Sequence, residues 1–372
     1  MNRLNLRLTT GFLALLLAAF FLNATGVSAA HPEPPKTDAR FAILIDAYAG
    51  KVFYEKNADS KAYPASTTKI LTLITALENS GRKDIVTVSA NAAGAEGSSC
   101  YLRADEEYFL ADIYYAMMLE SGNDAAIAIA EHIGGSVKGF VQMMNRTAQD
   151  IGAYNSHFNN PSGLPDPDHY TTARDMAMIA RYAIRHPAFA EIVATDKKAW
   201  PRKNRDQPLV LKNTNELLRS YFGANGIKTG STRSAKHCLV ASAKRNGLQL
   251  IAVLFYSEPF CWNDAQKLLD YGFSLITPKV VYKKGAPVKA VYVYKGESAA
   301  ELVAQEDVVL PVVGDYDKYT LEIKAESMLF APVNVSQHAG TLRILYDGEE
   351  IKAIPLFTKA EVGVQNAPLG ND

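Results

Sequence analysis

Hydrophobic and polar positions divide the chain into two stretches of different character. Up to about residue 274, several segments carry apolar residues at helical spacing, and short apolar runs typical of strands stand between them. From residue 275 onward, short runs rich in valine, tyrosine and isoleucine follow one another between turn residues. The pattern predicts a mixed α/β (α+β) domain over residues 40–274, a small all-β domain over residues 275–358 and a tail at residues 359–372.

The first domain is expected to open with a hairpin and a buried helix. Residues 41–46 (FAILID) form an apolar run, and residues 52–55 return after a turn. Apolar residues then recur at helical spacing between residues 70 and 77, and Pro64 stands in the segment that leads in. These signals predict a helix that begins near Ser66.

Further elements follow from periodicity and capping signals. A long loop rich in Asn, Pro, Asp and Gly is expected at residues 155–170, and Asn246-Gly247 indicates a hairpin turn. The expected helices are residues 105–119, 124–132, a segment capped by Ser136, 176–185 and 264–272. Thr172 and Asp175 fit a capping motif for the helix at residues 176–185. The expected strands are residues 84–89, 236–243 and 248–255. Residues 208–219 receive no assignment. In the all-β domain, strands are expected at residues 280–282, 288–294, 308–313, 319–323, 341–346 and 351–356.

Size and charge narrow the classes of function. A chain of 372 residues is long enough for two domains. Its 39 basic and 39 acidic side chains give a formal net charge of zero, and no long basic run interrupts the sequence. We therefore do not expect a nucleic-acid partner.

The first thirty residues differ from the rest of the chain. Arg3 and Arg7 precede an almost wholly apolar stretch at residues 11–22, and small residues follow up to Ala29 and Ala30. This order predicts a secretory signal peptide of residues 1–29 or 1–30, with an uncleaved N-terminal anchor as the alternative. The protein is then exported to the cell envelope, in the periplasm or on the extracellular face, and the proline-rich residues 31–39 form a linker.

The cysteines and histidines carry no pattern of metal ligands. Cys100, Cys238 and Cys261 form no C-x-x-C unit, so we interpret them as buried apolar residues, and a disulfide between two of them stays open. The seven histidines show no H-x-x-x-H or comparable spacing. We expect neither a metal nor another cofactor.

Candidate chemistry begins at the predicted helix start, where Ser66 and Lys69 are three positions apart. On a helix this spacing makes the two side chains neighbours, and a neutral lysine can take the proton of a serine nucleophile. Burial and a second cation would both lower the lysine pKa. Taken alone, this spacing occurs by chance in many proteins and favours the non-catalytic interpretation, with Ser66 as a helix cap and Lys69 as a solvated surface residue.

Two further motifs follow in order and favour the catalytic reading. Ser121-Gly-Asn123 interrupts a helical stretch, so that Ser121 can bond to Lys69 and relay a proton to a leaving amine. Asn123 can orient Lys69 and bond a substrate amide. Lys228-Thr-Gly230 lies on a predicted strand, where Lys228 adds positive charge that keeps Lys69 neutral and attracts a substrate carboxylate. Lys69 and Ser121 share one proton network, so the general base is not assigned to either alone.

The residues after Lys228 complete the expected site. Thr229 offers a hydroxyl to the same carboxylate, and Gly230 lets a substrate backbone approach closely because it has no side chain. The backbone N–H groups of Ser66 and Ser231 are the expected donors to the oxyanion that forms when the serine attacks a carbonyl.

With these motifs, the chain resembles the low-molecular-mass penicillin-binding proteins that are serine-type D-alanyl-D-alanine carboxypeptidases. The resemblance covers nearly all of the mature chain: YPASTTKILT around Ser66, MLESGNDAAIAIAEHIGG around Ser121, NPSGLPDPDHYTTARDMA, and GIKTGST followed by CLVASAKRNG. It implies a catalytic domain with an antiparallel sheet between helices and a C-terminal β-domain acting as a spacer. It also implies peptidoglycan stem peptides ending in D-Ala-D-Ala as substrates, an acyl-enzyme on Ser66 and acylation by β-lactams.

The sequence departs from the family pattern at several positions. Cys261 stands where relatives often carry an arginine, so carboxylate binding would rest on Thr229, Ser231 or Arg233. Asn225 replaces a commoner aspartate. Residues 357–372 lack the apolar stripe and basic face of an amphipathic membrane helix. Association with the membrane surface stays open, but no C-terminal anchor is evident.

Two other functions remain as alternatives. A β-lactamase would need a base for the deacylating water, a glutamate in class A enzymes, and residues 160–170 offer only Asp166 and Asp168. A non-catalytic penicillin or peptidoglycan sensor would keep the pocket and lose turnover. His157 and His169 are interpreted as braces of their loop rather than as bases, because Lys69 already fills that role.

Overall fold

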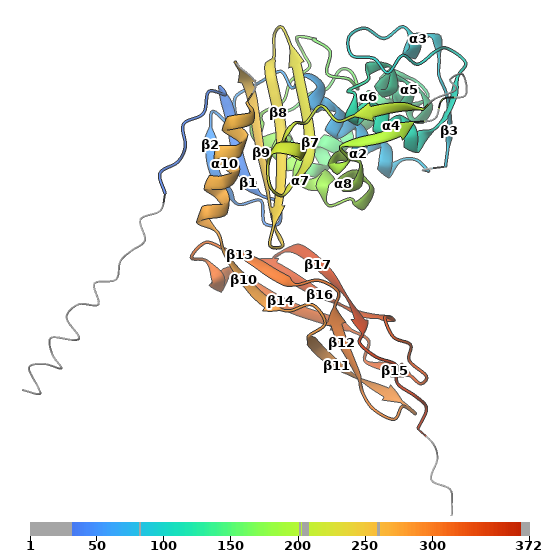
Figure 1. Cartoon of the computed structure of the whole chain (residues 1–372), viewed down its shortest axis with the longest axis vertical. Coiled ribbons are helices and arrows are strands. Elements are labelled where there is room, and N and C mark those ends of the chain that lie inside the picture. The colour runs from blue at the N-terminus through green and yellow to red at the C-terminus, as the bar shows by residue number, and fades with distance from the viewer. Residues whose placement is uncertain (1–31, 82, 201, 203–207, 259–260, 366–372) are drawn as a thin grey trace, which may run out of the picture. The chain divides into compact units, whose positions relative to one another are not determined.

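The computed structural model describes residues 32–81, 83–200, 202, 208–258 and 261–365 (Figure 1). The predicted signal peptide lies outside the described residues, as do the last seven residues of the predicted tail. None of the described helices has the length and apolar composition that crossing a membrane requires.

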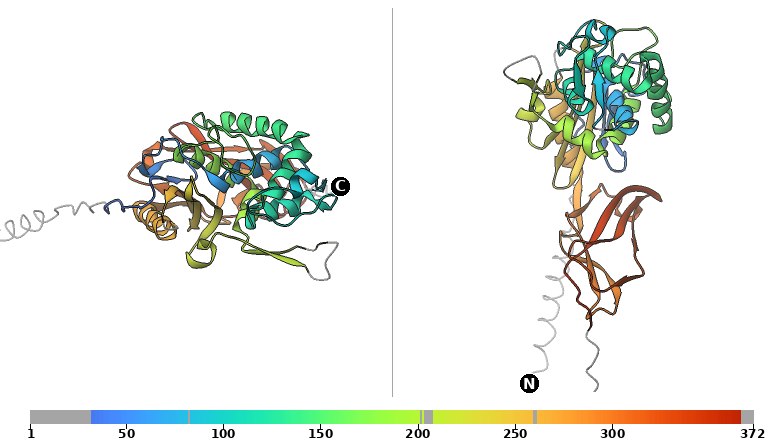
Figure 2. Two further views of the ribbon diagram at one scale, coloured as in Figure 1. Left: turned by 90° about the horizontal axis from the view of Figure 1, so that it is seen from above. Right: turned by 90° about the vertical axis from the view of Figure 1, so that its right-hand side faces the viewer.

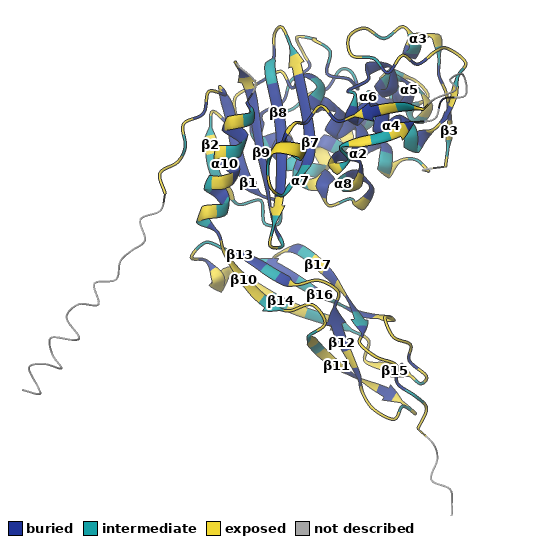
Figure 3. Cartoon of the chain, viewed as in Figure 1, coloured by how far each residue is buried: buried dark blue, intermediate teal, exposed yellow. Residues whose placement is uncertain are grey.

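A five-stranded antiparallel sheet forms the centre of the first domain, in the order β2-β1-β9-β8-β7. Its strands are β1 (Phe41–Asp46), β2 (Val52–Lys56), β7 (Ala224–Thr232), β8 (Lys236–Arg245) and β9 (Leu248–Ser257). Asn246 and Gly247 join β8 to β9 with positive φ angles of 49° and 79°, which confirms the predicted hairpin turn. Strand β9 is buried along almost its whole length (Figure 3), because helices cover both faces of the sheet.

Helices lie on both faces of this sheet, as two further views show (Figure 2). On one face, α10 (Trp262–Leu275) packs Leu268 and Leu269 into a core that includes Leu44 of β1. On the other face, the sheet shares its core with the buried sides of the remaining large helices. Those helices are α2 (Lys69–Glu78), α4 (Leu110–Leu119), α5 (Asn123–Gly134), α6 (Val137–Ile151), α7 (Ala173–Ile184) and α8 (Pro187–Ala194).

Short elements connect the large ones. The 3₁₀ helix η1 (Ala65–Thr68) leads into α2, and α3 (Ala90–Ala93) and α9 (Leu217–Ser220) are single turns. Two small hairpins complete the domain: β3 (Ile85–Thr87) with β4 (Glu107–Phe109), and β5 (Lys197–Trp200) with β6 (Leu209–Lys212). The predicted caps are confirmed, because the Ser136 side chain accepts from Gly139 N and that of Thr172 accepts from Asp175 N.

Two assignments in this domain differ from the prediction. The helix expected from residue 105 begins only at Leu110, because residues 107–109 pair with β3 as a strand. The acidic run at residues 105–107 resembles a helix start, and the long-range pairing that overrides this signal is not visible in a local pattern. Helix α8 was not predicted, and the unassigned residues 208–219 contain β6 and the start of α9.

The C-terminal region is all β apart from the 3₁₀ turn η2 (Tyr316–Lys318), as predicted. Strands β10 (Thr277–Tyr282) and β13 (Val308–Val312) pair with each other. A second sheet has the order β14-β16-β17-β12-β11-β15, formed by β11 (Pro287–Tyr294), β12 (Ala300–Ala304), β14 (Tyr319–Ala325), β15 (Met328–Phe330), β16 (His338–Tyr346) and β17 (Glu349–Thr358). Strands β12 and β15 were not predicted, because both are short and β12 alternates only weakly.

Candidate active site

Ser66 lies in the tight turn η1, directly before α2. In a 3₁₀ turn the side chains three positions apart lie above one another, and here they bring Lys69 Nζ to 3.1 Å from Ser66 Oγ. Ser66 is partly exposed, whereas Lys69 is fully buried. The Ser66 hydroxyl and the Lys69 amine are therefore neighbours, as predicted, and the hydroxyl lies on the solvent side.

The Lys69 amine makes two further contacts, at 2.7 Å to Asn123 Oδ1 and at 2.8 Å to Ser162 O. In its neutral form the amine has two N–H groups and one lone pair, so with the N–H groups directed to these two oxygens the lone pair is left for the Ser66 hydroxyl. Burial first, and then the charge of Lys228, holds the pKa of Lys69 well below its ordinary value. The shift has the direction and the two causes that the sequence predicted.

Ser121 and Asn123 stand at the junction of α4 and α5. Ser121 has a φ of 62°, and Asn123, the first residue of α5, bonds the lysine amine. The expected bond between Ser121 and Lys69 is not among the hydrogen bonds of the described residues, because the third contact of the amine goes to Ser162 O instead. Ser121 is 7% exposed, and Asn123, two residues further on, contacts the Lys69 amine.

Sequence reasoning missed the contribution of Ser162, although it marked the loop that carries this residue. Asn160 Oδ1 accepts from the backbone N–H groups of Ser162 and Gly163, which folds the loop back toward α2. Gly163 has a φ of 87°, and a Cβ at this position would lie 1.8 Å from Ala65 O. The sequence signal that could have identified Ser162 is therefore local: an asparagine and a glycine flank this serine in a loop rich in turn residues.

The two histidines of this loop are structural, as interpreted from the sequence. His169 Nε2 lies 2.8 Å from Thr68 Oγ1, and Asn159 N donates to His169 Nδ1 at 3.1 Å. Burial lowers the pKa of His169 to about 4, so its ring is neutral at pH 7. His157 Nδ1 bonds Asp168 O. Both side chains brace the loop that presents Ser162.

Strand β7 brings the third motif to the serine. A Cβ on Gly230 would lie 2.8 Å from Ser66 N, so the strand passes the nucleophile at a distance that only glycine allows. Lys228 is buried, donates to Thr229 O at 3.1 Å, and has its pKa lowered to about 7 by burial. Ser231 is exposed at the end of this approach.

Residues around Thr229 bear on the predicted carboxylate site. Thr214 Oγ1 lies 2.7 Å from Thr229 Oγ1, and this partner was not predicted because it belongs to the segment without assignment. Cys261, at the position of the family arginine, is 2% exposed, whereas Arg233 is exposed. All three cysteines are buried free thiols, which settles the alternative left open for a disulfide.

The comparisons with known proteins agree with this site. The sequence profile of D-alanyl-D-alanine carboxypeptidases, peptidase family S11, matches residues 28–258. The profile of the C-terminal domain of penicillin-binding protein 5 matches residues 277–364. The chain belongs to the D-alanyl-D-alanine carboxypeptidase family. The fold and activity implied by the sequence resemblance are thereby confirmed.

Relatives match this carboxypeptidase along most of its length. It is 36% identical over 335 residues to the D-alanyl-D-alanine carboxypeptidase DacF of Bacillus subtilis, covering 87% of this chain and 86% of the relative. It is 34% identical to DacC of Escherichia coli, covering 89% and 86%. Among solved structures, the carboxypeptidase DacD of Francisella tularensis aligns with a TM-score of 0.64 at 28% identity, covering 93% of this chain and 100% of that one.

Proposed function

We propose that this carboxypeptidase removes the terminal D-alanine from peptidoglycan stem peptides through an acyl-enzyme on Ser66. The Ser66 oxygen attacks the carbonyl carbon of the D-Ala-D-Ala bond, and Lys69 accepts its proton. The C–N bond then breaks, a proton passes to the leaving amine by way of Ser121, and D-alanine departs. Water hydrolyses the ester and restores the serine. The contact of 3.1 Å between Ser66 Oγ and the buried Lys69 amine, whose pKa burial holds well below its ordinary value, carries this proposal.

The surroundings of Ser66 suit the oxyanion that each step forms. The N–H groups of Ser66 and Ser231 are the proposed donors, and Gly230 supports this assignment because it lies against Ser66 N. Lys228 and the Thr229 hydroxyl are the proposed partners of the terminal carboxylate. Asn123 is proposed to bond the substrate amide in addition to Lys69.

The same site residues would also suit a β-lactamase, but the structure supports this function less well. Asp166 Oδ1 accepts from Asn159 Nδ2 at 2.9 Å and from Asp168 N at 2.8 Å, so this carboxylate holds its own loop. Because Asp166 is held by its own loop, we expect the acyl-enzyme formed with a β-lactam to be long-lived. We further propose that the protein works outside the cytoplasm, where its substrate lies.

The test is to measure both reactions on one preparation. We expect release of D-alanine from a pentapeptide that ends in D-Ala-D-Ala, together with labelling by a fluorescent penicillin that persists after free label is removed. Rapid loss of the label would indicate a β-lactamase. Persistent labelling without any release of D-alanine would indicate a sensor.

The lowered pKa of the buried Lys228 leads to a prediction of how D-alanine release depends on pH. Because its pKa is about 7, Lys228 carries its charge below that pH and loses it above. A substrate carboxylate binds the charged form, so kcat/KM for D-alanine release should fall as pH rises through about 7. The Lys228→Gln variant should be less active and lack this alkaline limb. An alkaline limb of unchanged position in Lys228→Gln would contradict the assignment.

A further inference from the structure

A segment between α3 and β4 holds the amide of Asn123 in place. Asn123 Nδ2 donates to Glu96 O at 2.6 Å, and its backbone N–H donates to Ser98 O at 2.7 Å. A Cβ on Gly97 would lie 2.8 Å from the same Nδ2 atom, so the segment lies directly against the side chain. Because the other end of this amide accepts from Lys69, the orientation of the Asn123–Lys69 bond depends on residues 96–106.

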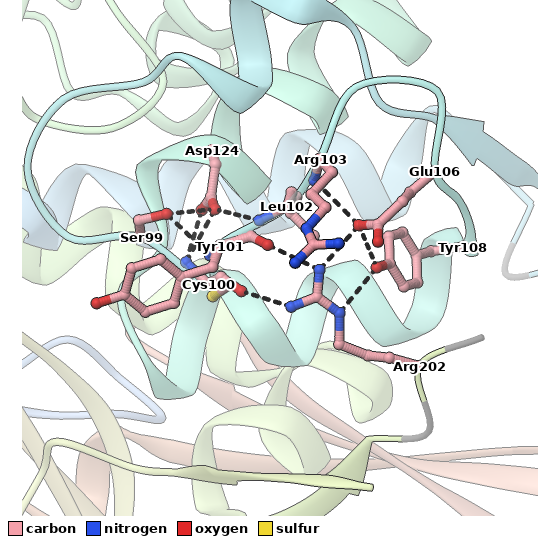
Figure 4. Close-up of polar contacts among 9 residues, drawn as sticks. All are labelled: Ser99, Cys100, Tyr101, Leu102, Arg103, Glu106, Tyr108, Asp124 and Arg202. Atoms are coloured by element: carbon pink, nitrogen blue, oxygen red, sulfur yellow. Dashed lines mark hydrogen bonds and ion pairs between the residues drawn. The ribbon is translucent and has the colours of Figure 1, made fainter. Parts of the chain in front are cut away.

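Asp124 anchors this segment from the side of α5 (Figure 4). Its carboxylate is 1% exposed and accepts from Cys100 N at 2.9 Å, from Leu102 N at 3.1 Å and from Ser99 Oγ at 2.7 Å. A buried carboxylate with several N–H and O–H donors is a strong, directional anchor. The backbone N–H groups of the segment therefore point toward α5.

Arg202 anchors the same segment through its carbonyl groups (Figure 4). Its Nη1 donates to Cys100 O at 3.1 Å and its Nη2 to Tyr101 O at 2.7 Å. Its Nη2 also pairs with Glu106 Oε2 at 2.8 Å, and its Nε donates to Tyr108 Oη at 3.0 Å. The side chain is only 4% exposed, and the planar guanidinium fits these acceptors as a fork, which a lysine cannot do.

We propose that Arg202 is a positioning residue for catalysis: it clamps residues 100–106 from outside, so that residues 96–98 keep Asn123 aligned on Lys69. Arg202 follows β5, which belongs to a hairpin distant in sequence from all three motifs. Cys100 of the clamped segment is buried, and its Sγ donates to Ala116 O of α4 at 3.3 Å, so the segment also packs against the helix that precedes Ser121. This inference rests on the proposed roles of Asn123 and Lys69.

A change in the surroundings of Lys69 should be measurable as a change in the pH dependence of activity, because few charged or titratable groups of the described residues face this amine. Lys69 faces Lys228 on β7, Cys100 on the clamped segment and Asp124 on α5. Burial raises the pKa of the Cys100 thiol far above neutral, so it does not titrate in the assay range. Burial alone would raise the pKa of Glu106, but hydrogen bonds from Tyr108, Arg103 N and Arg202 together lower it to about 2, so its pair with Arg202 persists. The proposal therefore assigns the acid limb of the activity profile to Lys69, whereas His169, with a pKa of about 4, bonds Thr68.

The test compares Arg202→Met and Arg202→Lys with the wild type. Loosening the segment admits water to Lys69, which raises its pKa and moves the acid limb of kcat/KM to higher pH, by about one unit. In Arg202→Met, kcat should fall about 10- to 100-fold while KM changes little, because misplacement of a catalytic group mainly affects the transition state. Arg202→Lys should shift less. Arg174→Met, which removes only exposed ion pairs with Glu55 and Asp59, is the matched control and should behave as the wild type.

If the acid limb of kcat/KM stays in place in the Arg202 variants, the proposal is wrong, whether activity is retained or lost. An arginine with only a structural role would lower the amount of active enzyme without changing its pH profile. If Arg202→Met does not fold, the same criterion applied to Arg202→Lys decides. Ser66→Ala, measured in the same assay, distinguishes a failure of the proposed function from a failure of the role proposed for Arg202. Activity in Ser66→Ala would refute the proposed function, whereas an inactive Ser66→Ala beside an unmoved acid limb would refute only the role of Arg202.

Discussion

Ser66→Ala is expected to lose D-alanine release by about 10⁴- to 10⁶-fold, because removal of the nucleophile from a catalytic serine site leaves only the oxyanion donors and binding. The measurement is kcat/KM on a pentapeptide ending in D-Ala-D-Ala. The change removes one partly exposed oxygen, so the melting temperature should stay within a few degrees of the wild type, roughly the effect of a surface substitution.

Ser60→Ala is the matched control for this prediction. Ser60 is an exposed serine six positions before the nucleophile in the same chain segment, and its substitution should leave kcat/KM unchanged. Equal rates of D-alanine release in Ser66→Ala and the wild type would show that another group carries out the reaction.

Lys69→Gln should be nearly as inactive, with a loss of about 10³- to 10⁶-fold in both D-alanine release and the rate of penicillin acylation. Glutamine is uncharged and can still donate to Asn123 Oδ1 or Ser162 O, but it has no amine lone pair that accepts the Ser66 proton. Lys69→Arg should fail for a different reason, because a guanidinium stays protonated at every pH of the assay.

Lys61→Gln is the corresponding control, because Lys61 is an exposed lysine on the same segment whose ammonium lies over the Tyr170 ring. Its rates should match the wild type. Normal acylation of Lys69→Gln by penicillin would assign the base role to another residue, and Ser121 would then be the first to test.

Much of this architecture can be predicted from the sequence because the local sequence signals agree with the fold. The Asn246-Gly247 turn, the caps at Ser136 and Thr172 and the periodicity after Ser66 each act over a few residues, and each is present in the structure. The three motifs can also be recognised in the sequence, since each keeps its proposed catalytic residues together in a short run. Their meeting in one cleft is a property of the sheet, where β7 lies at the edge beside η1.

What the sequence conceals are contacts made by backbone atoms or by residues far away in the chain. The carbonyl of Ser162 replaces Ser121 as the third partner of Lys69, and no side-chain motif announces a carbonyl. Thr214 contacts Thr229, and Arg202 contacts residues 100 and 101, from the region around β5 and β6, whose pattern is too irregular to assign. The strand at residues 107–109 is set by its pairing with β3, which the acidic run at residues 105–107 does not reveal.

The account depends on a covalent bond at one oxygen, and intact-protein and peptide mass spectrometry after incubation with penicillin tests it most directly. We predict a single adduct with the mass of the opened β-lactam, located on the tryptic peptide that contains Ser66 and absent from Ser66→Ala. An adduct on any other residue, or an adduct that persists in Ser66→Ala, would contradict the account.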